Sequence, residues 1–175
     1  MKLHLGCGKR DFGEGWTHID TADFSHIASK EVTRLSYDDN TCDLIYASHL
    51  LEYFDRVEVV EVLQEWKRVL KPSGVLRLAV PDFEKLCSLY TSGHGIDRVL
   101  GPLYGKWGTP PMYHKTTYDF ASLSDLLHSV GFEDVARYDW RDTEHSHVDD
   151  HSQAYFPHMD KENGMLLSLN VEAVK

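Results

Sequence analysis

Apolar side chains recur along this chain with two different periods. Short apolar runs at residues 3–5, 44–47 and 75–80 are typical of buried strands, which carry few polar side chains when both faces are covered. Over residues 57–70, apolar residues recur every three or four positions instead, which places them on one face of a helix. The pattern therefore predicts buried strands joined by at least one amphipathic helix.

The predicted helix has recognisable start and stop signals. Asp55, followed three residues later by Glu58, resembles a capping box, and Pro72-Ser73-Gly74 ends the helix before the next apolar run. A strand, a helix and a second strand thus follow one another, and such alternation favours parallel strands joined by crossovers. The chain is expected to form an open, mostly parallel α/β sheet with helices on both faces.

Weaker patterns complete this architecture. Gly13 and Gly15 break the segment that would carry the first crossover helix, so we expect that helix to be shortened. Further elements are expected as strands at 16–20, within 28–35, at 134–138 and at 165–174, and as a helix at 122–130. Residues 92–115 show no clear period and are rich in Gly, Pro and aromatic residues, so a lid-like insertion is expected at about 92–118.

Composition narrows the class of protein. A chain of 175 residues with 42% hydrophobic content suits one domain, residues 1–175. The net charge of −10 argues against a nucleic-acid partner, which needs a clustered excess of Lys and Arg. Three cysteines form no C-x-x-C pair, and no run is apolar enough for a signal peptide or a membrane span. We therefore expect a cytoplasmic protein without a membrane partner.

A glycine turn and a carboxylate point to an adenosine-type cofactor. Gly6 and Gly8 follow the first strand, where glycines let a ligand approach the backbone, and Asp20 ends the second strand, where a carboxylate accepts bonds from ribose hydroxyls. Asp11 stands where a dinucleotide motif requires a third glycine, which disfavours nicotinamide and flavin dinucleotides. An ordinary strand-to-helix turn is the alternative interpretation.

Four segments together resemble the class I S-adenosylmethionine-dependent methyltransferases, in particular a small bacterial branch. The family's "R-V-L-K-P-G-G" turn is matched with Ser73 in place of the first glycine, and Ser122 to Phe132 is similar to its "L-x-x-L-L-x-x-A-G-F" segment. The four segments are Leu5 to Gly8, Gly15 to Asp20, Asp39 to Glu52 and Glu65 to Leu76. The resemblance implies a Rossmann-like fold and S-adenosylmethionine as cofactor.

The resemblance also implies roles for individual residues. Gly6, Cys7 and Gly8 would border the methionine part of the cofactor, and Asp20 would hold its ribose. Glu31 falls where the family places an acid that accepts the adenine amino group.

Two histidines are candidates for catalysis. Ser48 and His49 follow the fourth strand, where the family's backbone and side chains face the sulfonium and the acceptor, so Ser48 is expected at the cofactor and His49 as a general base. His114, in the lid-like segment, is the second candidate. The alternative for His49 is a strand-end histidine bonded to a backbone carbonyl.

Other polar and aromatic residues receive less specific interpretations. Glu52 is expected to cap or pair locally and is left out of the site. The histidine-rich stretch 144–151, with His158 beyond it, contains metal-ligand types but matches no closed site, which favours a solvated polar loop and no metal. The lid-like segment could line an acceptor pocket or form an ordinary packed insertion, and its candidate side chains are Tyr104, Trp107, Tyr113, His114 and Tyr118.

Two functions remain open from the sequence. The first is methyl transfer from S-adenosylmethionine to an oxygen, nitrogen or carbon atom of a small organic acceptor. The second is a degenerate binding or regulatory module that keeps the fold without catalysis. Neither the acceptor nor the oligomeric state follows from the residues.

Overall fold

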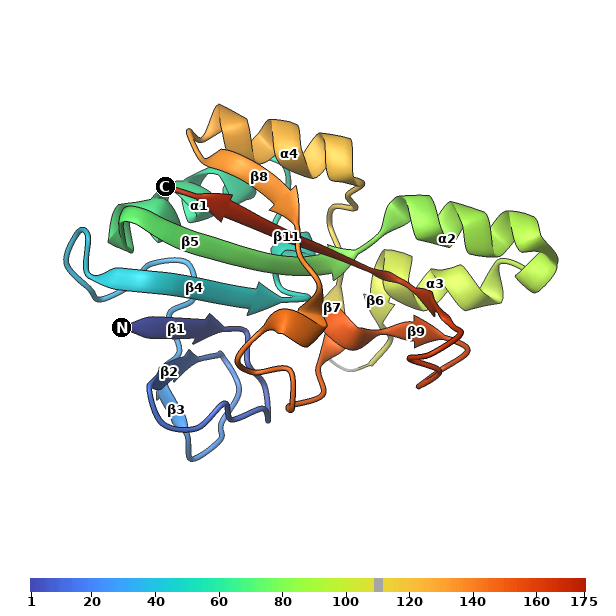
Figure 1. Ribbon diagram of the computed structural model, residues 1–175, viewed down its shortest axis with the longest axis horizontal. Helices are drawn as coiled ribbons and strands as arrows, with labels where there is room; N and C mark the ends of the chain where they lie inside the picture. The colour runs from blue at the N-terminus through green and yellow to red at the C-terminus, as the bar shows by residue number, and fades with distance from the viewer. Residues whose placement is uncertain (109–111) are drawn as a thin grey trace.

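A computed structural model describes residues 1–108 and 112–175, and it contains one seven-stranded sheet (Figure 1). The strand order is β3-β2-β1-β4-β5-β11-β8. The first five strands in this order run parallel to one another, and β11 runs antiparallel to both of its neighbours, β5 and β8. The strands of this sheet are β1 (Lys2–Leu5), β2 (Trp16–Ile19), β3 (Ile27–Ser29), β4 (Cys42–Ser48), β5 (Leu70–Pro81), β8 (Glu133–Arg137) and β11 (Ser168–Val174). The predicted open, mostly parallel α/β sheet is confirmed.

Helices and short strands make up the remaining regular structure. The helices are η1 (Leu51–Tyr53), α1 (Glu58–Val69), α2 (Phe83–Leu89), η2 (Tyr90–His94), α3 (Asp97–Tyr104), α4 (Phe120–Ser129), η3 (Trp140–Asp142) and η4 (His151–Gln153). The short strands pair as β6 (Gly105–Lys106) with β7 (Met112–Tyr113) and β9 (Tyr155–Phe156) with β10 (Met165–Leu166).

The capping signal before α1 works as the spacing predicts. The Asp55 carboxylate accepts hydrogen bonds from the backbone N–H groups of Val57 and Glu58, at 2.8 and 2.9 Å. The Glu58 carboxylate in turn accepts the backbone N–H of Asp55 at 3.0 Å. These bonds satisfy donors that a helix start would otherwise leave unpaired, so the chain enters α1 at a defined angle.

One face of the sheet carries the apolar core. Leu3, Ile45 and Leu76 point to this face and pack with Trp66 of α1 and Leu127 of α4. Figure 1 shows α1 and α4 on the same side of the sheet, while α2 and α3 extend beyond the carboxyl end of β5. The helices therefore pack mainly on one face of the sheet, whereas the sequence predicts helices on both faces.

The opposite face is covered mainly by a chain segment without α-helix. The rings of His4 and Phe12 stack at 3.9 Å, and those of Phe12 and His145 stack at 4.4 Å. The Tyr46 hydroxyl donates to Asp150 at 2.5 Å, which ties residues 139–154 to the sheet. Polar and aromatic side chains on this face need such partners once buried, so a hydrogen-bonded loop with two 3-10 turns takes the place of a helix layer.

The first crossover has no helix at all. Residues 6–15, all within the described part of the chain, form turns between β1 and β2. Gly13 and Gly15 have φ angles of 79° and 91°, which lie in the left-handed region that favours glycine. The helix that was expected to be shortened is therefore absent from residues 6–15.

The lid-like segment is more regular than expected. Residues 92–108 and 112–115 contain α3, β6 and β7, although the sequence shows no clear period there; residues 109–111 lie outside the described residues. Val99 and Leu103 pack against Leu86 and Leu89 of α2 in a small second core. Pro102 lies inside α3 and interrupts the apolar period, which explains why the pattern does not indicate a helix.

Candidate active site

A cavity of about 840 Å³ opens at the carboxyl edge of the sheet. Four strands end at its wall, because Gly6 follows β1, Asp20 follows β2, Ser48 ends β4 and Pro81 ends β5. Open α/β sheets bind their ligands at this edge, where the strand order reverses between β1 and β4. Five of the predicted residues therefore meet in one place although they are spread over residues 6–49, namely Gly6, Gly8, Asp20, Ser48 and His49.

The glycine turn and Asp20 form one hydrogen-bonded unit. One Asp20 oxygen accepts the backbone N–H of Gly8 and the other accepts that of Ala22, both at 2.7 Å. An ionised carboxylate oxygen can accept more than one donor, so both oxygens keep acceptor capacity toward the cavity. Nothing lies within 4 Å of the position that a Cβ atom would take at Gly8, which leaves the backbone open to a ligand.

The end of β4 turns sharply into the cavity. His49 has a φ of 51°, a conformation that non-glycine residues seldom adopt and that recurs at functional sites. The buried hydroxyl of Ser48, next to it, has no hydrogen-bond partner among the described residues. A buried hydroxyl without a partner that lines a cavity is available to a bound ligand.

The imidazole of His49 lies between two polar groups. Its Nδ1 is 3.4 Å from Oε1 of Glu52, and its Nε2 is 3.4 Å from Oγ of Ser168. Burial and the nearby His151, His114 and Arg10 together lower the pKa of His49 well below its usual value. The ring is therefore neutral at physiological pH and can accept a proton.

Glu52 is not the surface residue that the sequence suggests. Its side chain is fully buried in η1, and Oε1 lies 3.8 Å from Nε2 of His114 as well as near His49. Burial raises the pKa of this carboxyl group to about 8. The expected local contact is the one with His49, three residues earlier, whereas the burial of Glu52 under residues 114–116 is a contact that no local pattern reveals.

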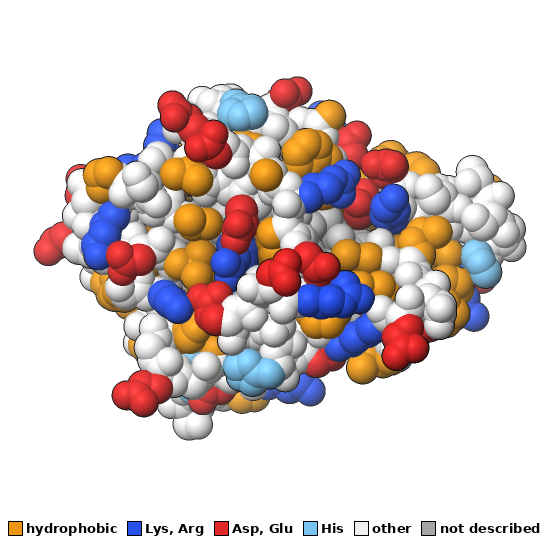
Figure 2. Space-filling view, viewed as in Figure 1, with side chains coloured by type: hydrophobic (Ala, Val, Ile, Leu, Met, Phe, Trp, Pro, Cys, Tyr) orange, Lys and Arg blue, Asp and Glu red, His pale blue; other side chains and the backbone are white. Residues whose placement is uncertain are grey.

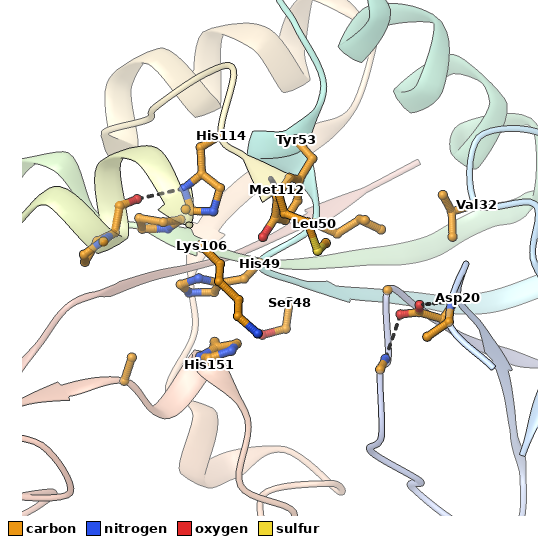
Figure 3. A pocket seen from close by; sticks show the side chains of 18 of the residues that line it. Asp20, Val32, Ser48, His49, Leu50, Tyr53, Lys106, Met112, His114 and His151 are labelled. Atoms are coloured by element: carbon orange, nitrogen blue, oxygen red, sulfur yellow. Dashed lines mark hydrogen bonds between the residues drawn. The ribbon is translucent and has the colours of Figure 1, made fainter. Parts of the chain in front are cut away.

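The lid segment supplies the far wall of the cavity (Figure 3). His114 and Lys106 point into the space that His49 and His151 face from the other side. His114 Nδ1 donates to the carbonyl of Pro102 at 2.8 Å, and burial lowers the pKa of the ring. The two predicted catalytic histidines are therefore brought to the same cavity.

The lid aromatics take other positions. Among the side chains proposed to line an acceptor pocket, only His114 does so, whereas Tyr104, Trp107 and Tyr113 are exposed and Tyr118 is buried outside the lining. The aromatic content of this segment therefore does not describe the pocket wall. Leu50, Tyr53, Pro102 and Met112 supply its apolar surface instead.

Two predicted cofactor residues do not line the cavity. Glu31 is exposed, and its neighbour Val32 is the lining residue from this segment, because β3 ends at Ser29. Cys7 is buried behind the turn, where its Sγ lies 3.9 Å from Nε2 of His26. Cys7 therefore supports the turn from behind.

The histidine-rich stretch divides between two places. His145 is 2% exposed and packs under the sheet, which contradicts a solvated loop, while His151 lines the cavity. In residues 1–108 and 112–175, no three histidine, cysteine or acidic side chains are grouped so as to hold a metal ion.

Sequence reasoning missed several charged or polar lining residues. Arg10 follows the glycine turn and donates its Nε to the carbonyl of Asp149 at 3.1 Å, while Lys106 and His151 come from distant segments. The sequence could have indicated Arg10 as a lining residue, since it lies two residues after Gly8. Lys106 and His151 carry no local signal.

The sequence of the first half matches a known family. Residues 9–78 match the family model described as a methyltransferase domain, and this range includes Asp20, Ser48 and His49. The chain also has the fold of solved methyltransferases over 99% of its length. Residues 9–78 are therefore similar to a methyltransferase domain, and the chain as a whole has the fold of SAM-dependent methyltransferases.

Solved structures similar to this chain come from several organisms. One is described as a SAM-dependent methyltransferase from Archaeoglobus fulgidus, with 17% identity, a TM-score of 0.62 and coverage of 99% of this chain and 85% of the other. A second, from Methanosarcina mazei, has 18% identity, a TM-score of 0.57 and coverage of 99% and 91%. A third, from Haloferax volcanii, is a methyltransferase in complex with the activator Trm112, with 15% identity, a TM-score of 0.58 and coverage of 99% and 81%. At these identities the likeness shows the fold.

Two further findings concern curated proteins and the helices of this chain. None of the curated proteins compared matches the chain. Across the described helices, none has the length and apolar content needed to cross a bilayer.

Proposed function

We propose that the protein transfers the methyl group of S-adenosylmethionine to a small organic acceptor. The observation that carries this proposal is the shared cavity, in which Gly8 and Asp20 face the same space as His49 and His114. Several of the structurally similar methyltransferases are described as dependent on this cofactor. When bound, the cofactor supplies a methyl group that is already electrophilic, so the protein's task is to position the acceptor and exclude water.

The residues at the strand ends suit this cofactor. The open backbone at Gly8 would border its methionine part, and Asp20 would accept the ribose hydroxyls. The unpaired Ser48 hydroxyl is available to either ligand.

The cavity has room for both reactants. Ligand pockets usually measure about 300–1,000 Å³, and this one lies near the upper limit. Its far wall, made by Tyr53, Pro102 and Met112, is largely apolar and suits an organic molecule. We propose that the lid segment, in its described residues 92–108 and 112–118, closes over this end and keeps water out.

His49 is the proposed general base for an acceptor that must lose a proton. It lies directly after β4, at the edge where the cofactor residues meet, and its lowered pKa keeps the ring neutral. A positioned base of this kind contributes about 10²- to 10⁴-fold to a rate. His114, which faces the same cavity from the lid, is the second candidate.

The alternative is a regulatory or binding module without catalysis. The helix-free first crossover favours it, because class I folds usually place a helix after the glycine turn. A degenerate copy would bind neither S-adenosylmethionine nor S-adenosylhomocysteine, whereas an enzyme binds both.

Calorimetry with the two cofactor forms tests the proposal. The wild type should bind both, and Asp20→Ala should weaken binding at least tenfold, since each lost charge-assisted bond contributes about 1.5–3 kcal/mol. Asp23→Ala is the matched control, because that side chain is exposed and pairs only with Lys30. A folded wild type that binds neither compound would establish the non-catalytic alternative.

A further inference from the structure

The carboxyl group of Glu52 has no hydrogen-bond partner. Neither oxygen is bonded to any residue in the part of the chain that the structure describes, and the side chain is fully buried. A buried carboxyl group without a partner is costly, so it persists where another requirement holds it. The groups around Glu52 indicate what that requirement is.

Two histidines of the cavity face the same oxygen of Glu52. Nδ1 of His49 lies 3.4 Å from Oε1 on one side, and Nε2 of His114 lies 3.8 Å from it on the other. The carbonyl of Pro102 fixes the proton of His114 on Nδ1, so Nε2 carries the lone pair that is directed at Glu52. The carboxyl group thus lies between a proposed base and a lid histidine.

The remaining titratable groups near this cluster come from other elements. Tyr53 of η1 and Tyr118 before α4 flank Glu52, and burial, together with the carboxyl charge, raises the pKa of both phenols. Arg10 and His151 approach His49 from the far side and favour its neutral form. No Lys or Arg in the described chain forms an ion pair with Glu52, which is why its burial is not offset by an opposite charge.

We propose that Glu52 is a positioning residue that shares one proton with His49 and His114, and thereby links the proposed base to the seating of the lid. The catalytic part of this inference rests on the proposed function. The proton-sharing part rests on the geometry of the three side chains and holds for the protein without ligands.

The proton balance of the step is simple. The step uses the tautomer of His49 that carries its proton on Nδ1: Nε2, which lies 3.4 Å from Oγ of Ser168, takes the proton of the acceptor, and Nδ1 gives its proton to the ionised Glu52 carboxylate. The acceptor keeps the electron pair and forms its bond to the methyl group, while the cofactor sulfur keeps the pair of the bond that breaks. Since the histidine ends neutral, no imidazolium remains in a buried site where burial disfavours it.

The lid provides the exit for this proton. The backbone carbonyl of Glu52 accepts the N–H groups of Lys115 and Thr116, at 2.8 and 3.2 Å, so the segment carrying His114 is fastened to Glu52 itself. When the lid opens, His114 leaves with it and can carry the proton from Glu52 to solvent. Closure restores the contact and excludes water from the pair.

Nuclear magnetic resonance of the ligand-free protein tests the proton sharing directly. With glutamate labelled at its carboxyl carbon, one group should titrate near pH 8, and the ring signals of His49 and His114 should shift in the same step. Glu52→Gln should remove that step from both histidines. Glu61→Gln, which changes an exposed residue of the same helical region, should leave it intact.

The wild-type titration is informative even if Glu52→Gln does not fold. If every glutamate titrates near its ordinary value, or if neither histidine senses the step near pH 8, the proposal is overturned. The measurement uses no cofactor, so failure of the proposed methyl transfer, decided by calorimetry, is a separate result.

Turnover separates positioning from a merely structural role. With an acceptor found by screening with radiolabelled methyl donor, the wild-type rate should rise through about pH 8 as Glu52 ionises. Glu52→Gln should keep its cofactor affinity, lose that alkaline rise and turn over at least about tenfold more slowly at pH 8.5. An unchanged pH profile in a folded variant would contradict the inference.

Discussion

Ionisation of Glu52 should lower the stability of the protein as the pH rises, and the substitution Glu52→Gln isolates this effect. In the unfolded chain the carboxyl group has its ordinary pKa of 4.5, whereas burial raises the pKa to about 8 in the folded protein. Between these values the folded protein holds a proton that the unfolded chain has lost, so the free energy of unfolding decreases with pH. The loss is about 1.4 kcal/mol per pH unit, or roughly 5 kcal/mol over the whole window.

The assay is urea unfolding followed by tryptophan fluorescence at pH 5 and pH 7.5. Glutamine has the size of the protonated acid and does not titrate, and the other ionisable groups are common to both proteins. Relative to the wild type, Glu52→Gln should therefore gain about 3 kcal/mol of stability between the two pH values. Glu61→Gln should show no such gain, since that side chain is exposed. A difference between wild type and Glu52→Gln that does not change with pH would refute the reasoning.

Three further predictions concern the cavity. Gly6→Val should fold but not bind S-adenosylmethionine in calorimetry, because Gly6 has a φ of 65° and an added Cβ would lie 3.1 Å from Leu50; normal binding would place the cofactor elsewhere. Hydrogen exchange in residues 92–108 and 112–118 should slow when cofactor binds, and equal protection with and without ligand would make this segment a static part of the fold. His49→Ala should keep cofactor affinity within a few-fold and lose turnover by at least about a hundredfold. Near-normal turnover would leave His114 as the candidate base, and lost cofactor binding would assign His49 to the cofactor pocket.

The sequence predicts the residues at the strand ends of the cavity well because that part of the wall is built locally. Gly6, Asp20, Ser48 and His49 each follow a strand that the apolar pattern indicates. Parallel strands bring their carboxyl ends to one edge, so the pattern alone implies that these residues meet. Glu31 lies two residues beyond the end of β3, and a short strand with a weak pattern cannot position it.

The residues at the lid side of the cavity could not be predicted from the sequence, because their positions depend on contacts between distant segments. In the sequence Glu52 resembles an ordinary surface acid, and only the contact with the lid segment buries it. Lys106 and His151 reach the cavity from opposite sides. Hydrophobic periodicity carries no information on such contacts. His145 illustrates the same limit, because a polar sheet face can bury a histidine that composition assigns to solvent.

The place of β11 in the sheet governs when the fold can be completed during synthesis. β11 pairs with β5 on one side and with β8 on the other, yet it comes after both in the chain. While residues 168–174 are still within the ribosome, the facing edges of β5 and β8 are open, and open strand edges invite pairing with other chains. The nascent chain is therefore prone to aggregate until β11 has emerged, and a chaperone that covers these edges until then should raise the yield of folded protein.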